Sequence, residues 1–170
     1  MTLLATPSTD LQGKVATLLY EEAASVDEQR WDDWLALFAE QVEYWIPSWD
    51  SEHQYTTNPR NEVSLMYYDS RAGLEDRVFR ILTERSAASL PLPRTSHMVS
   101  NIRVFENADG TCTVNANWIV NLFRSGESSS YFGRYQYLLK PSADGRLKIA
   151  RKLILVLNDK IATVLDIYSV

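Results

Sequence analysis

The fold class follows from one run of sequence, Thr111-Cys-Thr-Val-Asn-Ala-Asn-Trp-Ile-Val-Asn-Leu-Phe-Arg124. Apolar and polar residues alternate along it, which predicts a strand with one buried face. The residues expected on the buried face are Cys112, Val114, Ala116, Trp118, Val120 and Leu122. The residues that fall between them on the other face include Asn115, Asn117 and Asn121.

Similar runs lie on both sides of this strand and are separated by turn-forming residues. We expect further strands over 95–105, 131–140, 146–157 and 161–168, with turns at 107–110, 142–145 and 158–159 and a polar hairpin loop over 125–130. Nearer the N-terminus, a strand over 42–46 ends at Pro47, which has no N–H for the ladder. Residues 48–61 are expected to be a loop that holds a short strand, and 62–68 a strand or a buried turn.

Helical spacing appears in three places before the main run of strands. Thr9 and Gln12 fit a capping box for a helix that ends near Ser25. A second helix, capped by Asp27, is expected to bury one stripe of residues, Trp31, Trp34, Leu35 and Phe38. A third opens at Gly73 and has its own apolar stripe, Leu74, Val78, Ile81 and Leu82. Helices followed by consecutive strands predict an α+β fold, with the helices on one face of a mainly antiparallel sheet.

The composition is that of an ordinary globular domain. With 170 residues, we expect one domain over 1–170, and a flexible segment over 1–8. The net charge of −5 argues against a nucleic-acid partner, because there is no basic surplus to neutralise phosphates. We also expect no membrane partner, since no apolar run is long enough to span a bilayer. The start of the chain lacks the basic region of a signal peptide, so we expect a cytoplasmic protein.

The chain has few residues that could bind iron. Cys112 is the only cysteine, and His53 and His97 are the only histidines. A Rieske cluster needs two cysteines and two histidines, so the sequence excludes one. A mononuclear iron site of two histidines and a carboxylate would need the loop around His53 to meet the strand around His97, which we do not expect. Cys112 is expected to be a core thiol, because no neighbour in sequence would lower its pKa.

Several segments together resemble a known family. They are Gly73-Leu-Glu-Asp-Arg-Val-Phe-Arg-Ile-Leu-Thr-Glu-Arg85, Arg94-Thr-Ser-His-Met-Val-Ser-Asn101, Trp31-Asp-Asp-Trp-Leu-Ala-Leu-Phe38, Tyr44-Trp-Ile-Pro47 and Val164-Leu-Asp-Ile-Tyr168. From about Leu18 to Val170 the chain resembles the small (β) subunits of aromatic-ring-hydroxylating dioxygenases, in the benzoate, anthranilate and halobenzoate group.

The resemblance implies a fold, partners and cofactors. The fold would be the curved, cone-shaped NTF2-like (cystatin-like) sheet. A large α subunit would hold the Rieske [2Fe–2S] cluster and a mononuclear iron, NADH would deliver electrons through a separate reductase, and the complex would be α3β3. The chain itself would supply no ligand, acid or base, and would serve as a scaffold. The aromatic acid stays open among benzoate, anthranilate, 2-halobenzoate and salicylate.

His97 is the residue best suited to chemistry on this chain. In stand-alone NTF2-like enzymes a histidine and an aspartate inside the cone act as acid and base, and here Asp32, Asp33 or Asp69 could be the partner. This would make the chain a self-sufficient dehydratase or isomerase, and a small-ligand-binding module is a further alternative. We favour a buried or interface histidine that a backbone or carboxylate group holds, because no second catalytic motif accompanies it.

The arginines and aromatic residues have two interpretations each. The middle of the chain is rich in arginine: Arg71, Arg77, Arg80, Arg85, Arg94 and Arg103. They could bind an aromatic acid, but ion pairing with Glu75, Asp76 and Glu84 is the simpler interpretation. Aromatic residues could line a pocket, but more often they form core and interface. Our interface candidates are Trp49, Tyr55, Tyr67, Tyr68, Arg71 and Arg94.

Overall fold

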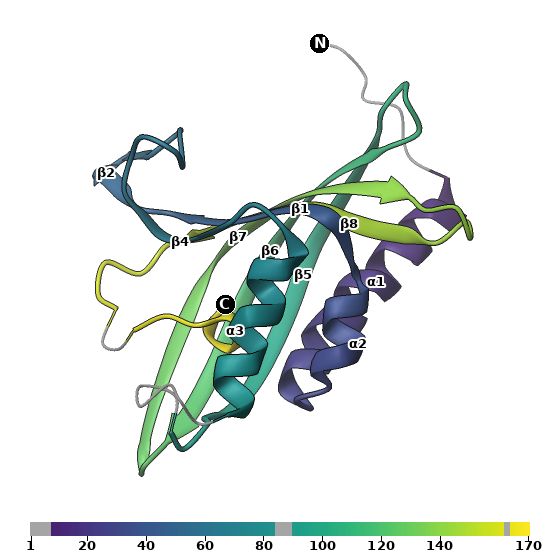
Figure 1. Cartoon of the computed structure of the whole chain (residues 1–170). Helices are drawn as coiled ribbons and strands as arrows, with labels where there is room; N and C mark the ends of the chain where they lie inside the picture. The colour runs from purple at the N-terminus through teal and green to yellow at the C-terminus, as the bar shows by residue number, and fades with distance from the viewer. Residues whose placement is uncertain (1–7, 84–89, 162–163) are drawn as a thin grey trace.

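The structure is a computed structural model that describes residues 8–83, 90–161 and 164–170. Its body is a six-stranded sheet with the order β4-β1-β8-β7-β6-β5 (Figure 1). The strands are β1 (Phe38–Pro47), β4 (Ser64–Tyr68), β5 (Arg94–Glu106), β6 (Cys112–Arg124), β7 (Glu127–Pro141) and β8 (Leu147–Val156). All neighbouring strands pair antiparallel except β1 and β8, which run parallel.

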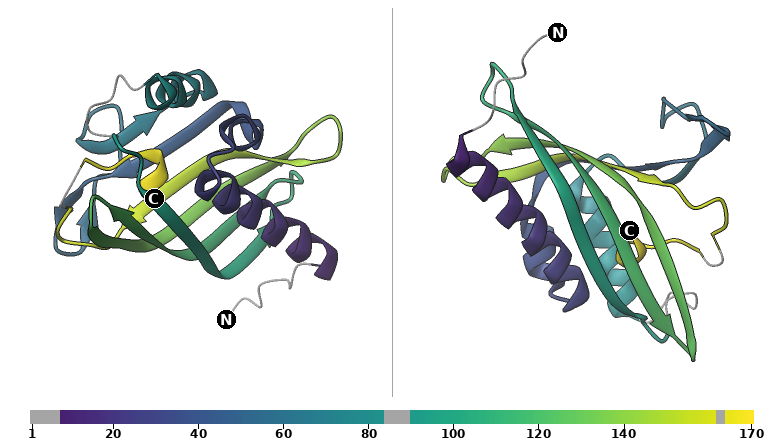
Figure 2. Two further views of the ribbon diagram at one scale, coloured as in Figure 1. Left: turned by 90° about the horizontal axis from the view of Figure 1, so that it is seen from below. Right: turned by 180° about the vertical axis from the view of Figure 1, so that it is seen from behind.

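The helices lie on the concave side of this sheet. They are α1 (Thr9–Asp27), α2 (Trp31–Ala36) and α3 (Arg71–Leu82), and the two views of Figure 2 show them alongside the curved strands. A small hairpin of β2 (Trp49–Ser51) and β3 (Gln54–Tyr55) projects from the end of β1 (Figure 1). The expected α+β architecture, a curved and mainly antiparallel sheet with helices on one side, is therefore confirmed. In the part of the chain that the structure describes, no helix is long and apolar enough to cross a membrane.

The predicted alternation along β6 is confirmed by its burial. The six residues expected to face inward are all buried: Cys112, Val114, Ala116, Trp118, Val120 and Leu122. Asn117 and Asn121 are exposed on the opposite face, and Asn115 is half-buried. The hairpin loop that follows is shorter than predicted, because β7 already begins at Glu127 and pairs with Arg124. Ser125 and Gly126 make the turn with positive φ angles of 52° and 88°, which suit the twist of a two-residue hairpin.

Aromatic side chains fill one end of the core, where α2 meets β1. Trp34 packs edge-on against Phe38, with ring centroids 4.7 Å apart, and lies 6.3 Å from Tyr44. The second predicted helix is wrong at both ends. Asp27 is the last residue of α1 and caps nothing, and Phe38 is the first residue of β1. Helical spacing placed Phe38 on the stripe, but its burial comes from the inner face of the sheet.

Two further boundaries and the burial of one residue differ from the prediction. Ser8, not Thr9, caps α1, and its hydroxyl accepts a hydrogen bond from the Leu11 N–H. Strand β1 starts four residues earlier than residue 42. Leu82 is 61% exposed, so it does not belong to the buried stripe of α3. The predicted flexible segment 1–8 falls outside the described residues apart from Ser8, and the same holds for Arg85 and Glu84.

The predicted last strand, 161–168, is wrong for its described part. Residues 162 and 163 lie outside the described residues, and Ile167–Ser169 form a 3-10 helix, η2. Asp166 determines this local structure. Its carboxylate accepts from the Ile167 N–H and from Arg77 Nε of α3, at 2.8 and 2.7 Å. Because these hydrogen bonds run to its own turn and to a helix, the segment 165–170 enters the core between helices and sheet and forms no strand pairing.

Candidate functional site

His97 lies on the inner face of β5, opposite Val120 of β6, and its side chain is 4% exposed. Its Nδ1 atom lies 2.6 Å from Oδ1 of Asp27, and its backbone N–H donates to Oδ2 at 2.8 Å. The Thr95 hydroxyl donates to the same carboxylate at 2.7 Å. The partner is thus Asp27 and not Asp32, Asp33 or Asp69, and the contact joins the end of α1 to β5.

The Asp27 carboxylate is stabilised in its charged form. Burial raises the pKa of this carboxyl, but the hydrogen bonds from His97 and Thr95 outweigh burial, so the pKa lies below its usual value. A charged Asp27 orients the ring of His97 through Nδ1. The other ring nitrogen, Nε2, is buried and has no hydrogen-bond partner among the described residues.

A second buried ionic contact lies close to His97. Lys152 of β8 donates to Glu22 of α1 at 2.7 Å, and the hydroxyl of Tyr137 donates to the same carboxylate at 2.8 Å. The two charged side chains are only 5% and 4% exposed. The Lys152 Nζ atom also lies 4.2 Å from the ring centroid of Tyr135, within cation–π range. Burial lowers the pKa of Lys152, and Glu22 opposes this effect.

His97 and the Glu22–Lys152 pair line one small cavity inside the cone. Its volume is about 10 Å³, the space of a single water molecule. Apolar side chains, among them Val99 and Val170, close the rest of its wall. Small-molecule sites usually measure ~300–1,000 Å³. The interior therefore holds residues of the acid–base type without room for an organic substrate between them.

A larger groove of about 960 Å³ lies elsewhere, between the N-terminal half of α1 and the turn that joins β7 to β8. Charged side chains line it together with Leu18 and Leu37, and they include Lys14, Glu21 and Lys148. Neither His97 nor Asp27 contributes to this groove, so the structure does not bring the candidate acid–base residue to this open space.

The predicted interface candidates fall into two groups. Trp49 is 38% exposed, and its indole N–H donates to the Val156 carbonyl at 2.7 Å while its ring packs edge-on against Tyr55. Tyr55 and Tyr67 are half-buried against a small cluster on the convex side of the sheet, Trp45, Leu153 and Leu155. Tyr68 points the other way and packs on the core, 6.5 Å from Tyr44.

Gly73 explains why Tyr68 can lie there. A Cβ atom at Gly73 would come within 2.7 Å of the Tyr68 ring, so any other residue at this position would have to displace that ring from its place between α3 and β4. Arg71 pairs with Glu75 one turn later on α3, at 2.9 Å. Arg94 stacks its guanidinium 4.6 Å from the ring centroid of Phe123.

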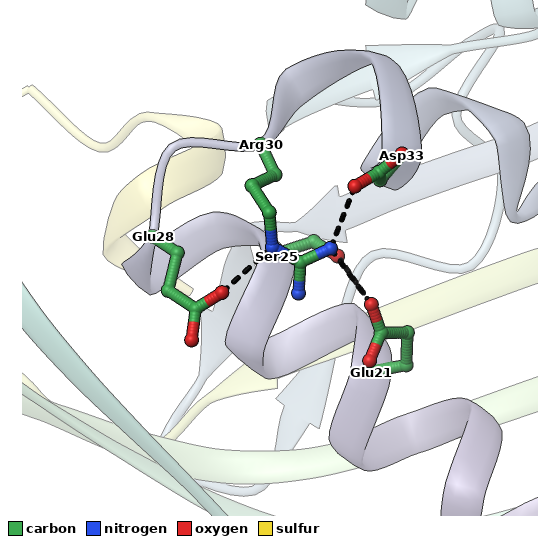
Figure 3. A network of polar contacts seen from close by, with 5 residues as sticks. All are labelled: Glu21, Ser25, Glu28, Arg30 and Asp33. Atoms are coloured by element: carbon green, nitrogen blue, oxygen red, sulfur yellow. Dashed lines mark hydrogen bonds and ion pairs between the residues drawn. The ribbon is translucent and has the colours of Figure 1, made fainter.

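Arginine also fixes the junction between the first two helices. Arg30 lies between α1 and α2 and contacts three carboxylates, those of Glu21, Glu28 and Asp33, at 2.8, 2.6 and 2.7 Å (Figure 3). The hydrogen bonds that Arg30 donates to Asp33, Glu28 and Glu21 raise its pKa above the usual value. Asp33, which the sequence offered as a partner for His97, is therefore engaged on the surface by Arg30.

The residues that the structure describes do not form an iron centre. His53 is exposed in the β2–β3 hairpin, whereas the side chain of His97 is buried and already bound to Asp27. Cys112 is buried as a free thiol, and burial raises its pKa. Among the described residues no three His, Cys, Asp or Glu side chains come together as a possible metal site.

Comparison with known proteins decides the family. The family model of the ring hydroxylating beta subunit matches residues 21–163 of the chain. The chain belongs to this family. The beta subunit of benzoate 1,2-dioxygenase from Acinetobacter baylyi is 47% identical to it over 158 residues, which are 92% of each protein.

Solved structures agree with the fold of this beta subunit. The crystal structure of the benzoate 1,2-dioxygenase beta subunit from Burkholderia mallei covers 99% of the chain and all of its own, with a TM-score of 0.76 and 36% identity. A scytalone dehydratase-like protein from Novosphingobium aromaticivorans shares the fold alone, with a TM-score of 0.64 and 16% identity over 91% of each chain. The resemblance and the NTF2-like fold expected from the sequence are both confirmed.

Three residues of this interior site were not predicted from the sequence: Glu22, Asp27 and Lys152. Asp27 has the residue type of a helix cap, but its partners Thr95 and His97 lie 68 and 70 positions away. The burial of Glu22 could have been predicted, because its helical spacing places it on the buried stripe of α1 with Val15, Leu19 and Val26. A charged residue in such a position needs a partner. Lys152 is buried between the buried residues Ala150 and Leu153 of β8, but nothing local pairs it with Glu22.

Proposed function

We propose that this beta subunit is the non-catalytic scaffold of a Rieske-type dioxygenase that dihydroxylates an aromatic acid. Its partner is a large subunit that carries the Rieske cluster and the mononuclear iron, and NADH supplies electrons through a separate reductase. Three copies of each subunit form an α3β3 complex in the cytoplasm. The benzoate dioxygenase names of its relatives favour benzoate or a substituted benzoate as the substrate.

The main support for this proposal is that side chains fill the interior of the cone. The space between helices and sheet that a stand-alone enzyme would use for substrate is occupied by buried side chains, including those of the segment 165–170. Only about 10 Å³ remains beside His97. A benzoate ring cannot enter that volume, so the Asp27–His97 contact serves to fasten α1 to β5 and does not act on a substrate.

The iron chemistry belongs to the partner because this chain has too few ligands. One cysteine cannot supply a Rieske cluster, which takes two cysteine and two histidine ligands. The beta subunit then contributes to the reaction by positioning the large subunits. By holding large subunits in fixed positions it keeps the electron-donating cluster of one near the iron of the next, and substrate choice lies mainly in the large subunit.

Co-expression tests the proposal. The chain is produced with and without the large subunit of a benzoate-type dioxygenase, and each preparation is assayed with benzoate, NADH and the reductase. We expect the chain to co-purify with the larger iron–sulfur protein and the diol product to form only when both are present. Conversion of benzoate, or dehydratase activity on a hydroxylated aromatic compound, by the purified chain alone would overturn it.

A further inference from the structure

The convex face of the sheet, which the helices leave uncovered, carries charge of one sign along β5, β6 and β7. All residues of these three strands are described, and the side chains on this face include four basic residues, Arg94, Arg103, Arg134 and Lys140, and no acidic one. The whole chain has a net charge of −5, so its remaining residues hold nine more acidic than basic groups. The positive charge of Lys140 is partly balanced by Asp109 of the β5–β6 turn. The positive charge of this face therefore comes mainly from Arg94, Arg103 and Arg134.

An apolar row crosses the same face. Met98, Ile119 and Phe132 are direct neighbours in the pairing of β5 with β6 and of β6 with β7. Met98 is 49% exposed and Phe132 45% exposed. Arginine, methionine and aromatic residues are enriched at protein interfaces, whereas acidic residues are depleted there. The face therefore has the composition of a binding surface.

The surface is also hollowed beside this row. A depression of about 510 Å³ lies between the strands near the β6–β7 turn, and its lining includes Arg94, Ser96, Asn121, Phe123 and Ser130. Arg94 and Phe123 form its edge, with the guanidinium stacked on the ring. A projecting side chain with an acidic neighbour would match both the shape and the charge of this depression.

The β2–β3 hairpin of the chain is such a projection. It stands away from the body of the molecule (Figure 1) and exposes the carboxylates of Asp50 and Glu52 next to Trp49. In the part of the chain that the structure describes, neither carboxylate forms an ion pair. Trp49 is held in place by its hydrogen bond to Val156, so its exposed edge is already ordered for binding.

We propose that the convex face of one beta subunit, at Arg94, Met98, Phe132 and Arg134, binds the β2–β3 hairpin of a second copy through Trp49, Asp50 and Glu52. The two surfaces are different, so the contact is head-to-tail, and such contacts close into rings when the rotation allows it. Each chain offers one face and one hairpin, so every copy in a ring is satisfied. This inference rests on the trimer of the proposed function and identifies the surfaces that would build it.

Charge reversal on both sides tests the pairing. The face variant is Arg94→Glu/Arg134→Glu, the hairpin variant is Asp50→Arg/Glu52→Arg, and a third protein carries all four changes. Lys14→Glu/Arg80→Glu is the matched control, because it reverses two exposed charges on the helices. Sedimentation velocity of each purified full chain gives its association state, and circular dichroism verifies that each variant is folded.

We expect the face and hairpin variants each to weaken self-association by ~10-fold or more, because like charges then meet at the contact. The four-fold variant should recover the association of the unmodified chain, and the control should keep it. Weaker association at ~1 M than at ~0.1 M salt should accompany this, since salt screens charge pairs. Folded single-side variants that still associate, a four-fold variant that stays dissociated, or an unmodified chain that is monomeric would each overturn the inference.

Co-purification with the large subunit separates this inference from the proposed function. If the unmodified chain binds the large subunit but the charge reversals leave its self-association unchanged, only the assignment of the surfaces fails. If the unmodified chain binds no large iron–sulfur subunit, the proposed function itself fails.

Discussion

Nδ1 of His97 lies 2.6 Å from Oδ1 of Asp27, so the last residue of α1 holds a side chain on the inner face of β5. The same carboxylate accepts the backbone N–H of His97. One acidic side chain thus fixes both the position of a strand and the orientation of an imidazole. The two residue types are those of a catalytic acid–base pair. Their burial beside a cavity of about 10 Å³ is typical of a structural contact.

The Asp27 contact should make stability depend on pH. The pKa of Asp27 is lower in the folded chain, so its stabilising effect is present above the usual aspartate pKa of ~4 and is lost as pH falls through the folded value. We expect Asp27→Asn to cost ~1–3 kcal/mol at pH 7 and less at pH 3. Urea unfolding followed by fluorescence at both pH values measures this. An equal cost at pH 3 and pH 7 would contradict the electrostatic explanation.

Replacement of His97 should leave the chemistry of the assembled complex intact. The ring faces a cavity of about 10 Å³, so no substrate reaches it. We expect His97→Ala to keep turnover within ~10-fold of the unmodified complex, because loss of a general acid or base typically costs ~100-fold or more. The comparison uses complexes of equal mass and iron content. A 100-fold fall under those conditions would show that His97 takes part in the reaction.

The buried Glu22–Lys152 pair should show strong coupling between its members. Lys152→Met leaves a buried carboxylate without its cation, which costs ~3–5 kcal/mol. Glu22→Gln/Lys152→Met removes both charges, and we expect it to be clearly more stable than Lys152→Met alone. A double-mutant cycle of unfolding free energies measures the coupling. Additive single effects would mean that the two side chains do not interact in solution.

Local patterns predicted most of the sheet. The alternation along β6 identified its buried face residue by residue, because a long strand in the middle of a sheet buries every second side chain. The turn residues between the strands marked where the chain reverses. These signals depend only on neighbours in sequence, so a single sequence contains them.

Contacts between distant residues explain what could not be predicted. Phe38 fits a helical stripe by spacing, but the chain leaves the helix before it because β1 pairs in parallel with β8, more than a hundred positions later. The residues 164–168 look like a strand, but Asp166 is bound by Arg77, 89 positions away. Neither the partner of His97 nor that of Glu22 can be chosen from residue types, since several acidic and basic residues were equally available.

Two glycines should respond in opposite ways to alanine. At Gly133 of β7 a Cβ atom would lie 1.7 Å from the Leu155 carbonyl oxygen of β8, a backbone atom that can move only if the strands separate. At Gly13, within α1, a Cβ atom would meet nothing within 4 Å. We expect Gly13→Ala to stabilise the chain by ~0.5–1 kcal/mol, the helix propensity difference, and Gly133→Ala to destabilise it by ~3 kcal/mol or more. Thermal unfolding of the two variants side by side gives both signs. An unchanged melting temperature for Gly133→Ala would mean that β7 and β8 are not packed this closely.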